Sequence, residues 1–156
     1  MRLFTFTSSL CGVAFLALAS AQTSPPESPD GLPDAPGKAT LLRICSECHG
    51  VNLIAEAAKT ADEWNESLSL MEAFGAYAAP DEWKDVEEYL VAHLAVVHVN
   101  AAPAAELQAF FDVSETAAAA IVAAREGRPF ETIDEVKKVE GVDPAKIDAR
   151  RARVVF

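Results

Sequence analysis

The chain has 156 residues, of which 51% are hydrophobic and 24% are charged, and its formal net charge is −11. This length accommodates one ordinary domain or two small ones, and the hydrophobic fraction excludes a disordered chain. The acidic charge argues against a protein whose main role is to bind phosphate backbones. After the first twenty residues no apolar run is long enough to cross a bilayer, so the mature protein is predicted not to span a membrane.

The first 36 residues carry the features of an export segment followed by a tether. Arg2 precedes an apolar run over residues 3–18, and Ala19-Ser20-Ala21 supplies small residues for cleavage. This pattern predicts a secretory signal peptide over 1–21 and a periplasmic or secreted protein. Residues 22–36 then contain five of the nine prolines, which disfavour both helix and sheet and predict a semi-extended linker.

The remaining sequence divides into two blocks that differ in charge. Residues 22–98 carry 14 acidic and 4 basic side chains, a net charge of −10, whereas residues 99–156 carry 10 acidic and 8 basic, a net charge of −2. Hydrophobic residues recur at helical spacing in both blocks. We therefore expect an all-α protein with one domain over 37–98 and a second over 99–156.

The run Cys45-Ser-Glu-Cys48-His49 is the chemical centre of the first block. It follows a short predicted helix with an apolar stripe, and its Cys-x-x-Cys-His spacing is the attachment signature of c-type haem. Two thiols at this spacing add to the two vinyl groups on one edge of the porphyrin, and the adjacent imidazole then ligates the iron. A thioredoxin-like redox pair needs a βαβ setting, and a zinc site needs a second ligand cluster. One covalent haem c is therefore predicted, held by Cys45 and Cys48 with His49 as the proximal iron ligand.

Met71 is the predicted distal iron ligand. Thr60 is expected to cap a helix on which Trp64, Leu68 and Met71 share one face. A thioether is a neutral ligand that raises the potential of haem iron. The alternative is that Met71 only fills space in the core.

Two histidines provide a second alternative for the distal position. Asp81 is expected to cap a further helix, on which His93 shares an apolar stripe with Val86 and Leu90. His93 is either a core histidine or the distal ligand of a bis-His centre. His98 lies near the junction between the blocks and is the weaker candidate.

The segment from residue 36 to 97 resembles a small class I cytochrome c, and it is most similar to haem-binding domains of quinohaemoprotein amine dehydrogenase alpha subunits. The resemblance rests on four stretches: Gly37-Lys-Ala-x-Leu, Cys45-Ser-Glu-Cys48-His49, Met71-Glu-Ala-Phe-Gly75 and Glu88-Tyr89-Leu90. It implies an all-α haem pocket with His49 and Met71 as axial ligands, and one-electron transfer.

The second block reads as paired helical hairpins. A helix over 104–111 is followed by the turn Asp112-Val113-Ser114 and an alanine-rich helix, and a similar unit recurs around Gly141-Val142-Asp143. The segment 97–155 resembles a tandem helix-hairpin-helix domain of the competence protein ComEA type. In DNA-binding members the hairpin is Gly-hydrophobic-Gly, and its backbone amides hold a phosphate.

This sequence departs from that pattern at the hairpins themselves. The first turn has no glycine, and the second has Asp143 in place of its second glycine. Ser114 and Asp143 stand where an N-cap belongs, so their oxygens can occupy the amides that a phosphate would use. Six basic residues could still form a patch: Lys137, Lys138, Lys146, Arg150, Arg151 and Arg153.

The sequence therefore predicts an exported monohaem c-type cytochrome that acts as an electron carrier and not as an enzyme. Its helix-hairpin-helix module is expected to serve protein docking or scaffolding, its acidic surface to meet a basic redox partner, and no nucleic acid is expected as a partner. The alternative is a nucleic-acid-binding protein, ComEA-like, that carries a haem domain. Enzymatic use of the haem would require a free position at the iron, with Met71 unbound.

Overall fold

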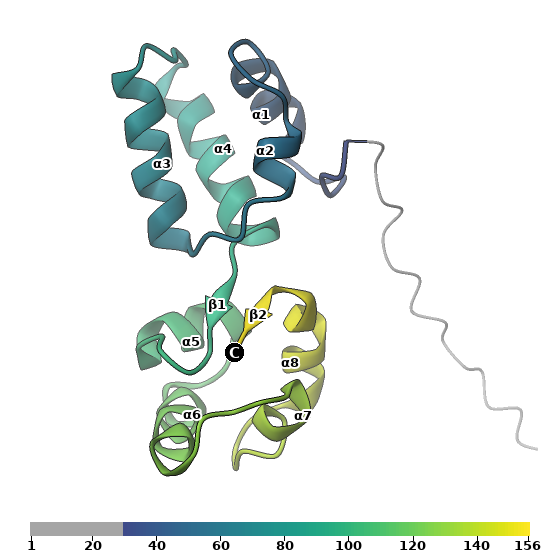
Figure 1. Ribbon diagram of the computed structural model, residues 1–156, viewed down its shortest axis with the longest axis vertical. Coiled ribbons are helices and arrows are strands. Elements are labelled where there is room, and N and C mark those ends of the chain that lie inside the picture. Colours follow the sequence, from purple (N-terminus) through teal and green to yellow (C-terminus); the bar gives the residue numbers. More distant parts are fainter. Residues whose placement is uncertain (1–29) are drawn as a thin grey trace, which may run out of the picture.

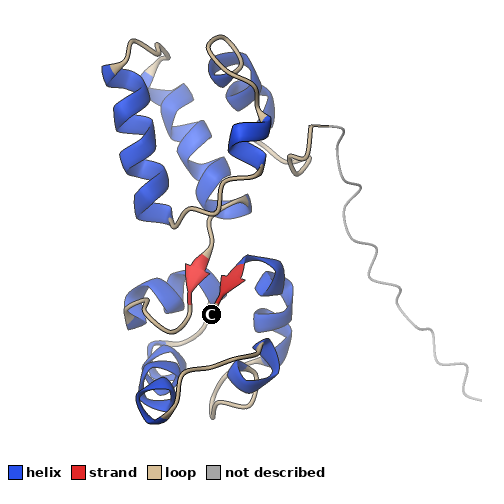
Figure 2. Cartoon of the chain, viewed as in Figure 1, coloured by secondary structure: helices blue, strands red, loops and turns tan. Residues whose placement is uncertain are grey.

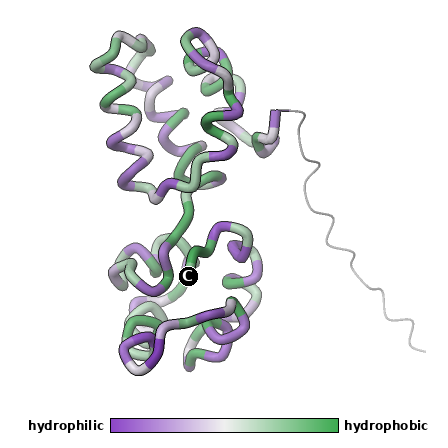
Figure 3. The backbone as a smooth tube through the Cα atoms, viewed as in Figure 1, coloured by the Kyte–Doolittle hydropathy of each residue, from purple (hydrophilic) through white to green (hydrophobic). Residues whose placement is uncertain are grey.

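The structure is a computed structural model that describes residues 30–156. The predicted signal peptide, 1–21, and the first part of the predicted linker, 22–29, lie outside the described residues. Within 30–156 the chain is mostly helical, as predicted, and forms two helical modules joined by a short hydrophobic connection (Figures 1 and 3). No helix in this range is both long and apolar enough to cross a membrane.

The N-terminal module consists of four helices around one core (Figure 1): α1 (Lys38–Cys45), α2 (Asn52–Ala55), α3 (Ala61–Ala73) and α4 (Pro80–His93). Helix α4 packs against both α1 and α3. The core is built from Leu41 and Ile44 of α1, Trp64 of α3, and Val86 and Leu90 of α4. These side chains recur at helical spacing, so each helix buries one stripe against its neighbours.

Residues 30–36, the end of the predicted linker, pack onto this module and do not form a free tether. Leu32 is buried in the core, the Tyr89 hydroxyl donates to the Pro33 carbonyl at 2.6 Å, and Lys38 Nζ donates to the Leu32 carbonyl at 3.0 Å. Burial, with the nearby Asp30 and Asp34, raises the pKa of Tyr89 to about 12. The prolines exclude regular structure here, but the buried leucine fixes the segment nevertheless.

Gly37 allows α1 and α4 to approach each other closely. Its φ is +90°, and a Cβ at this position would lie 2.8 Å from the Asp85 carbonyl oxygen and 2.9 Å from Tyr89 Cβ. Only glycine adopts this conformation without strain and leaves that space empty. The close contact fixes where α1 begins, at Lys38.

The helix starts agree with the sequence in one case and differ in the other. Thr60 caps α3 as predicted, in a capping box with Glu63. The predicted cap of α4 at Asp81 is wrong, because α4 begins at Pro80 with Ala79 as the N-cap. Proline has no N–H and a helical φ, so it takes the first helical position. The Glu82 carboxylate accepts the Ala79 N–H at 2.8 Å.

The C-terminal module contains α5 (Ala104–Phe111), α6 (Glu115–Gly127), α7 (Ile133–Val136), α8 (Pro144–Arg150) and a 3₁₀ turn over Arg151–Arg153. Two short strands, β1 (Val97–His98) and β2 (Val154–Val155), pair in parallel with Val97 opposite Val154 (Figure 2). Parallel strands require a long crossover, and here α5–α8 provide it. The core includes Leu107, Phe111, Ile121, Val136 and Ile147.

Asn100 and Arg125 form hydrogen bonds that hold separate segments of this module together. Asn100 Nδ2 donates to the Phe130 carbonyl at 2.9 Å, and the Phe130 N–H donates to Asn100 Oδ1 at 2.8 Å. Arg125 donates to the Val99 carbonyl at 2.7 Å. These bonds connect the residues that follow β1 to α6 and to the segment after α6.

The two modules contact each other through the end of α4. Arg150 Nη1 donates to the Ala92 carbonyl at 3.0 Å, and Arg153 Nη1 donates to the Ala95 carbonyl at 3.1 Å. Both guanidinium groups lie over the Phe110 ring, 5.9 and 5.2 Å from its centroid. Cations suit this place, because the last carbonyls of a helix lack partners and carry its negative dipole end.

Candidate functional site

The Cys45–His49 motif lies at the end of α1 and in the turn that follows. Leu41 and Ile44 bury the inner face of α1, which leaves Cys45 half-buried at the edge of the core, whereas Cys48 is exposed. Both cysteines are free thiols. Burial raises the pKa of the Cys45 thiol, and the neighbouring Cys48 raises it further. Cys45 is therefore a protonated thiol at neutral pH.

His49 is oriented by its own backbone. Its Nδ1 lies 3.2 Å from the Gly50 carbonyl oxygen. With a proton on Nδ1, the ring donates to this carbonyl and leaves the Nε2 lone pair free. This is the arrangement by which proteins fix the tautomer of a metal-binding histidine.

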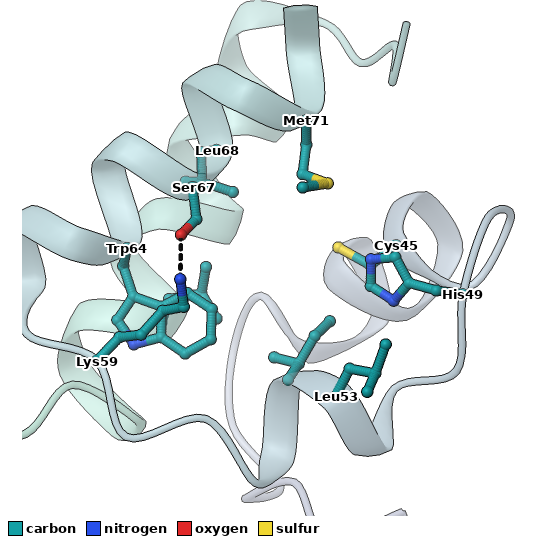
Figure 4. Close-up of a pocket in the computed structure, with 10 residues that line it drawn as sticks. Cys45, His49, Leu53, Lys59, Trp64, Ser67, Leu68 and Met71 are labelled. Atoms are coloured by element: carbon teal, nitrogen blue, oxygen red, sulfur yellow. Dashed lines mark hydrogen bonds between the residues drawn. The ribbon is translucent and has the colours of Figure 1, made fainter. Parts of the chain in front are cut away.

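A cleft separates this motif from α3, and Met71 projects into it from the α3 side (Figure 4). The cleft has two lobes, with volumes of ≈ 260 and ≈ 270 Å³. Both lobes are lined by the same four residues: Cys45, His49, Leu68 and Met71. Taken together, the lobes fall within the range of about 300–1,000 Å³ that is typical of cofactor and small-ligand sites.

The walls of the cleft are mainly apolar. Leu53, Ile54 and Leu90 line the first lobe, and Ile44, Phe74 and Trp83 line the second. Phe74 and Leu53 are also strongly exposed, at 80% and 61%, so apolar side chains continue to the rim. A monomer rarely leaves such side chains clustered around a hollow unless the hollow binds something.

One end of the cleft is polar. Lys59 Nζ donates to Ser67 Oγ at 2.7 Å and lies 5.8 Å from the centroid of the Trp64 ring (Figure 4). Trp64 is 5% exposed, and its Nε1 is buried with no hydrogen-bond partner among residues 30–156. A buried N–H without an acceptor is rare in folded proteins.

The structure separates the alternative histidines from this cleft. His93 lies in the last turn of α4, 5.1 Å from the Tyr89 ring between centroids, and lines a different hollow with Pro36 and Gly37. Burial lowers the pKa of His93, and Arg153 and Arg150 lower it further. His98 lies on β1 and is exposed. The cleft thus contains His49 and Met71 but neither alternative ligand.

These residues fit a haem group in several respects. The cleft is apolar, as a flat macrocycle requires. The thiols of Cys45 and Cys48 and the imidazole of His49 line one side of it, and the thioether of Met71 lies on the other side. Within residues 30–156, no group of three or more His, Cys, Asp or Glu side chains is placed to hold a bare metal ion.

In both hairpins of the C-terminal module, a side chain of the hairpin accepts a hydrogen bond from a backbone N–H of the helix that follows. Asp112 has φ +52°, in the left-handed region, and ends α5. Ser114 Oγ accepts the Ala117 N–H at 3.1 Å, and Asp143 Oδ1 accepts the Ala145 N–H at 2.9 Å. Both predicted caps are therefore present, and each occupies an amide at the start of a helix.

The predicted basic patch is largely committed to contacts within the protein. Lys146 bridges the hairpins by an ion pair to Asp112 at 2.7 Å, and Lys137 pairs with both Asp134 and Asp148. Arg150 and Arg153 cap α4. Four of the six cations therefore have partners within the protein and are not free to form the basic patch.

Sequence reasoning missed two sets of residues that shape these sites. Lys59 and Ser67 lie eight positions apart, and the only sign of their role was that Lys59 is one of four bases in an acidic block. The contacts of Arg150 and Arg153 with α4 depend on how the modules dock. No local pattern in the sequence reports that docking.

Comparison with known families gives one finding. Residues 93–155 match the family model described as "Helix-hairpin-helix motif", which covers less than half of the chain. The match supports the helix-hairpin-helix part of the prediction, and with it a nucleic-acid-binding or docking module. The match does not extend to the predicted cytochrome c domain. No curated protein and no solved structure matches the chain.

Proposed function

We propose that residues 37–98 hold one covalently attached haem c and that the protein is an exported one-electron carrier. The observation that carries this proposal is the cleft that Met71 shares with Cys45 and His49. Met71 lies 22 positions after His49, on a different helix, and yet its thioether projects into the same space as the motif (Figure 4). A Met used only as core filler has no reason to line a cleft beside a Cys-x-x-Cys-His motif.

Each residue would have a distinct role in holding the group. Cys45 and Cys48 would add their S–H bonds across the two vinyl double bonds, which forms two thioethers without an oxidant. His49 Nε2 and Met71 Sδ would bind the iron, and the apolar walls would exclude water. Bound haem supplies a one-electron couple between Fe(III) and Fe(II). If both His49 and Met71 bind the iron, no open position would remain for a substrate, which favours a carrier over an enzyme.

The acidic surface indicates the kind of redox partner. The block 22–98 has a net charge of −10, so its field attracts a partner with a basic docking surface and speeds their encounter at low salt. The signal peptide predicted over 1–21 is consistent with this role, because c-type haem is attached after export. We therefore propose a periplasmic or secreted location.

The decisive test is whether the protein carries covalently attached haem. The full chain, produced with a haem c maturation system and extracted with acid-acetone, should retain one haem in its mass. A Cys45→Ala/Cys48→Ala variant should lose it, whereas Ser46→Ala/Glu47→Ala, which changes the exposed residues between the cysteines, should keep it. If acid-acetone removes all haem from the wild-type protein, the proposal is wrong.

A second candidate function is nucleic-acid binding, and the family match favours it more directly than it favours electron transfer. The geometry of the hairpins argues for the docking alternative instead. A phosphate at the first hairpin would have to displace the Ser114 cap and would meet Asp112, which already neutralises Lys146. At the second hairpin it would meet Asp143. We infer that this module contacts protein.

A binding experiment with duplex DNA distinguishes these two alternatives. Non-specific binding depends on phosphate neutralisation and typically gives Kd values of roughly 10⁻⁴–10⁻⁶ M. Labelled duplex should not bind the full chain at moderate salt, whereas an Asp112→Gly/Ser114→Gly/Asp143→Gly variant should bind measurably because its amides are freed. Low-micromolar binding by the unmodified protein, with a steep salt dependence, would establish the nucleic-acid function instead.

A further inference from the structure

One wall of the cleft is formed by α2, which has little support from the other helices. Leu53 and Ile54 of this four-residue helix line the first lobe. Its hydrogen bonds are local, because the N–H groups of residues 53–57 donate to carbonyls of residues 50–54. Among residues 30–156, the main helix contacts of this module join α4 to α1 and to α3, and α2 is not part of them. A single helical turn is not stable by itself in water, so another part of the chain has to hold it in place.

Residues 30–36 supply this support. Gly31 lies directly against α2, because a Cβ on Gly31 would be 3.3 Å from the Cβ of Ala55. Leu32 is 1% exposed and belongs to the same core cluster as Ile54. Figure 1 shows the segment before α1 running beside α2. Helix α2 thus faces the cleft with Leu53 and Ile54, and it faces this segment with Ala55.

The segment itself is anchored to α1 and α4. Lys38 Nζ pairs with the Asp30 carboxylate at 3.0 Å and donates to the Leu32 carbonyl at 3.0 Å, and the Tyr89 hydroxyl donates to the Pro33 carbonyl at 2.6 Å. The Leu32 N–H donates to Asp30 Oδ1 at 2.9 Å, which closes a turn around the buried leucine. Lys38 and Tyr89 are both buried, and a buried donor is costly without its acceptor. Two long helices therefore fix the segment, and the segment in turn supports α2.

We infer that residues 30–36 position α2 as a wall of the cleft, with Gly31 and Leu32 as the positioning residues. The role of this wall toward a cofactor rests on the proposed haem c. Cys45 and His49 line the first lobe together with Leu53 and Ile54, so a displaced α2 would admit water beside both. Solvent access is one of the factors that set the potential of a bound haem. Part of the predicted linker thus belongs to the site.

The test compares Leu32→Ala with two other variants of the full chain. Leu32→Ala removes the side chain that packs with Ile54, whereas Leu32→Met keeps its bulk and should restore the wild-type behaviour. Val86→Ala is the matched control, because Val86 is buried in the same core cluster but lines neither lobe of the cleft. Urea unfolding of each variant gives the loss of global stability.

The first measurement needs no haem. In a Cys11→Ala/Cys48→Ala background Cys45 is the remaining cysteine, and its reaction with an aromatic disulfide reagent reports access to the cleft. Without urea this reaction should be about tenfold or more faster in Leu32→Ala than in Leu32→Met or Val86→Ala, since truncation of a buried leucine removes packing worth more than this factor. The faster reaction should be independent of low urea concentrations, because a local displacement exposes little surface, whereas reaction through global unfolding depends steeply on urea.

The second measurement uses the haem-loaded chain. The midpoint potential should fall in Leu32→Ala and stay at the wild-type value in Leu32→Met and Val86→Ala, because water in the cleft stabilises the more highly charged oxidised iron. An unchanged potential in haem-loaded Leu32→Ala overturns the role of the wall toward the cofactor.

The outcomes separate this inference from the proposed function. If Cys45 in Leu32→Ala reacts with the steep urea dependence of global unfolding, the positioning role is wrong, whether or not the protein carries haem. If Leu32→Ala does not fold, Tyr89→Phe, which removes only the hydrogen bond to the Pro33 carbonyl, decides by the same two measurements. A wild-type chain without covalent haem overturns the proposed function, and the reaction of Cys45 then still decides whether residues 30–36 hold α2.

Discussion

At the scale of single residues, Met71 and His93 show how tertiary structure separates two side chains that the sequence offers as a predicted ligand and its alternative. Both lie on apolar helix faces at plausible distances from the Cys-x-x-Cys-His motif. Helix α3 directs Met71 into the cleft, whereas the last turn of α4 places His93 beside Tyr89 in a separate hollow. The distal role proposed for Met71 can therefore be tested against His93 directly.

In the haem-loaded protein, Met71→Ala should abolish the weak far-red absorption band of thioether-ligated ferric haem. It should also lower the midpoint potential, because the neutral thioether favours Fe(II). Visible spectra and redox titration provide the measurement, with His93→Ala as the comparison that should leave both unchanged. If His93→Ala removes the distal ligand and Met71→Ala does not, the centre is bis-His.

His93 should instead make the fold sensitive to acid. Burial, Arg153 and Arg150 lower its pKa in the folded state, so the unfolded chain binds a proton more readily near its ordinary pKa of about 6.5. Stability is then complete above that value and falls as the pH drops through it toward the lower folded-state pKa.

Urea unfolding at pH 7.5 and 5.5 measures this effect. His93→Gln should lose less stability than the wild-type protein between these two pH values. His98→Gln, at an exposed position on β1, controls for the loss of a histidine elsewhere. An unchanged pH response in His93→Gln would mean that other groups account for the acid sensitivity.

At the scale of secondary structure, the sequence predicts well those features that depend on residues close together in the chain. The Thr60 and Asp143 caps and the motif at the end of α1 depend on neighbours within a few residues, and all three lie where expected. The Asp81 cap failed for an equally local reason, because Pro80 takes the first helical position.

Features that join distant segments could not be predicted in this way. The strands β1 and β2 have two residues each, too short to show alternation, and they pair across the whole second module. The same holds for the candidate site: the motif and the helical face of Met71 follow from spacing, whereas the approach of Lys59 to Ser67 and Trp64 depends on how the loop before α3 folds back.

The start of α1 offers a prediction at this scale. Gly37→Ala should destabilise the protein by about 1–3 kcal/mol, because φ is +90° and the new methyl group would press against the Asp85 carbonyl and Tyr89. Gly127→Ala is the matched control, since a Cβ there meets nothing within 4 Å, and its effect should be within ~1 kcal/mol. Equal urea midpoints for the two variants would show that α1 is not fixed at this glycine.

At the scale of the whole molecule, the C-terminal module caps the end of helix α4 in the N-terminal module. Its two arginines supply donors to the carbonyls at the end of α4, and the Phe110 ring fills the space beneath them. Burial, together with Arg150, lowers the pKa of Arg153 to about 10, so desolvation offsets part of what its hydrogen bonds contribute. The contact is still the main polar link between the modules, and it should make them unfold together.

Arg153→Met tests this coupling, because it keeps an apolar side chain over Phe110 and removes the donors. We expect a loss of about 1–2 kcal/mol in the free energy of unfolding, and Arg151→Met, at the exposed neighbouring position, should have a smaller effect. Both tryptophans, Trp64 and Trp83, lie in the N-terminal module, so fluorescence follows that module while far-UV circular dichroism follows both. The two unfolding curves should coincide in the wild-type protein and separate in Arg153→Met. If they remain coincident in the variant, the hydrophobic connection through Val96 and Val97 couples the modules without the arginine, and the polar contact serves only to cap α4.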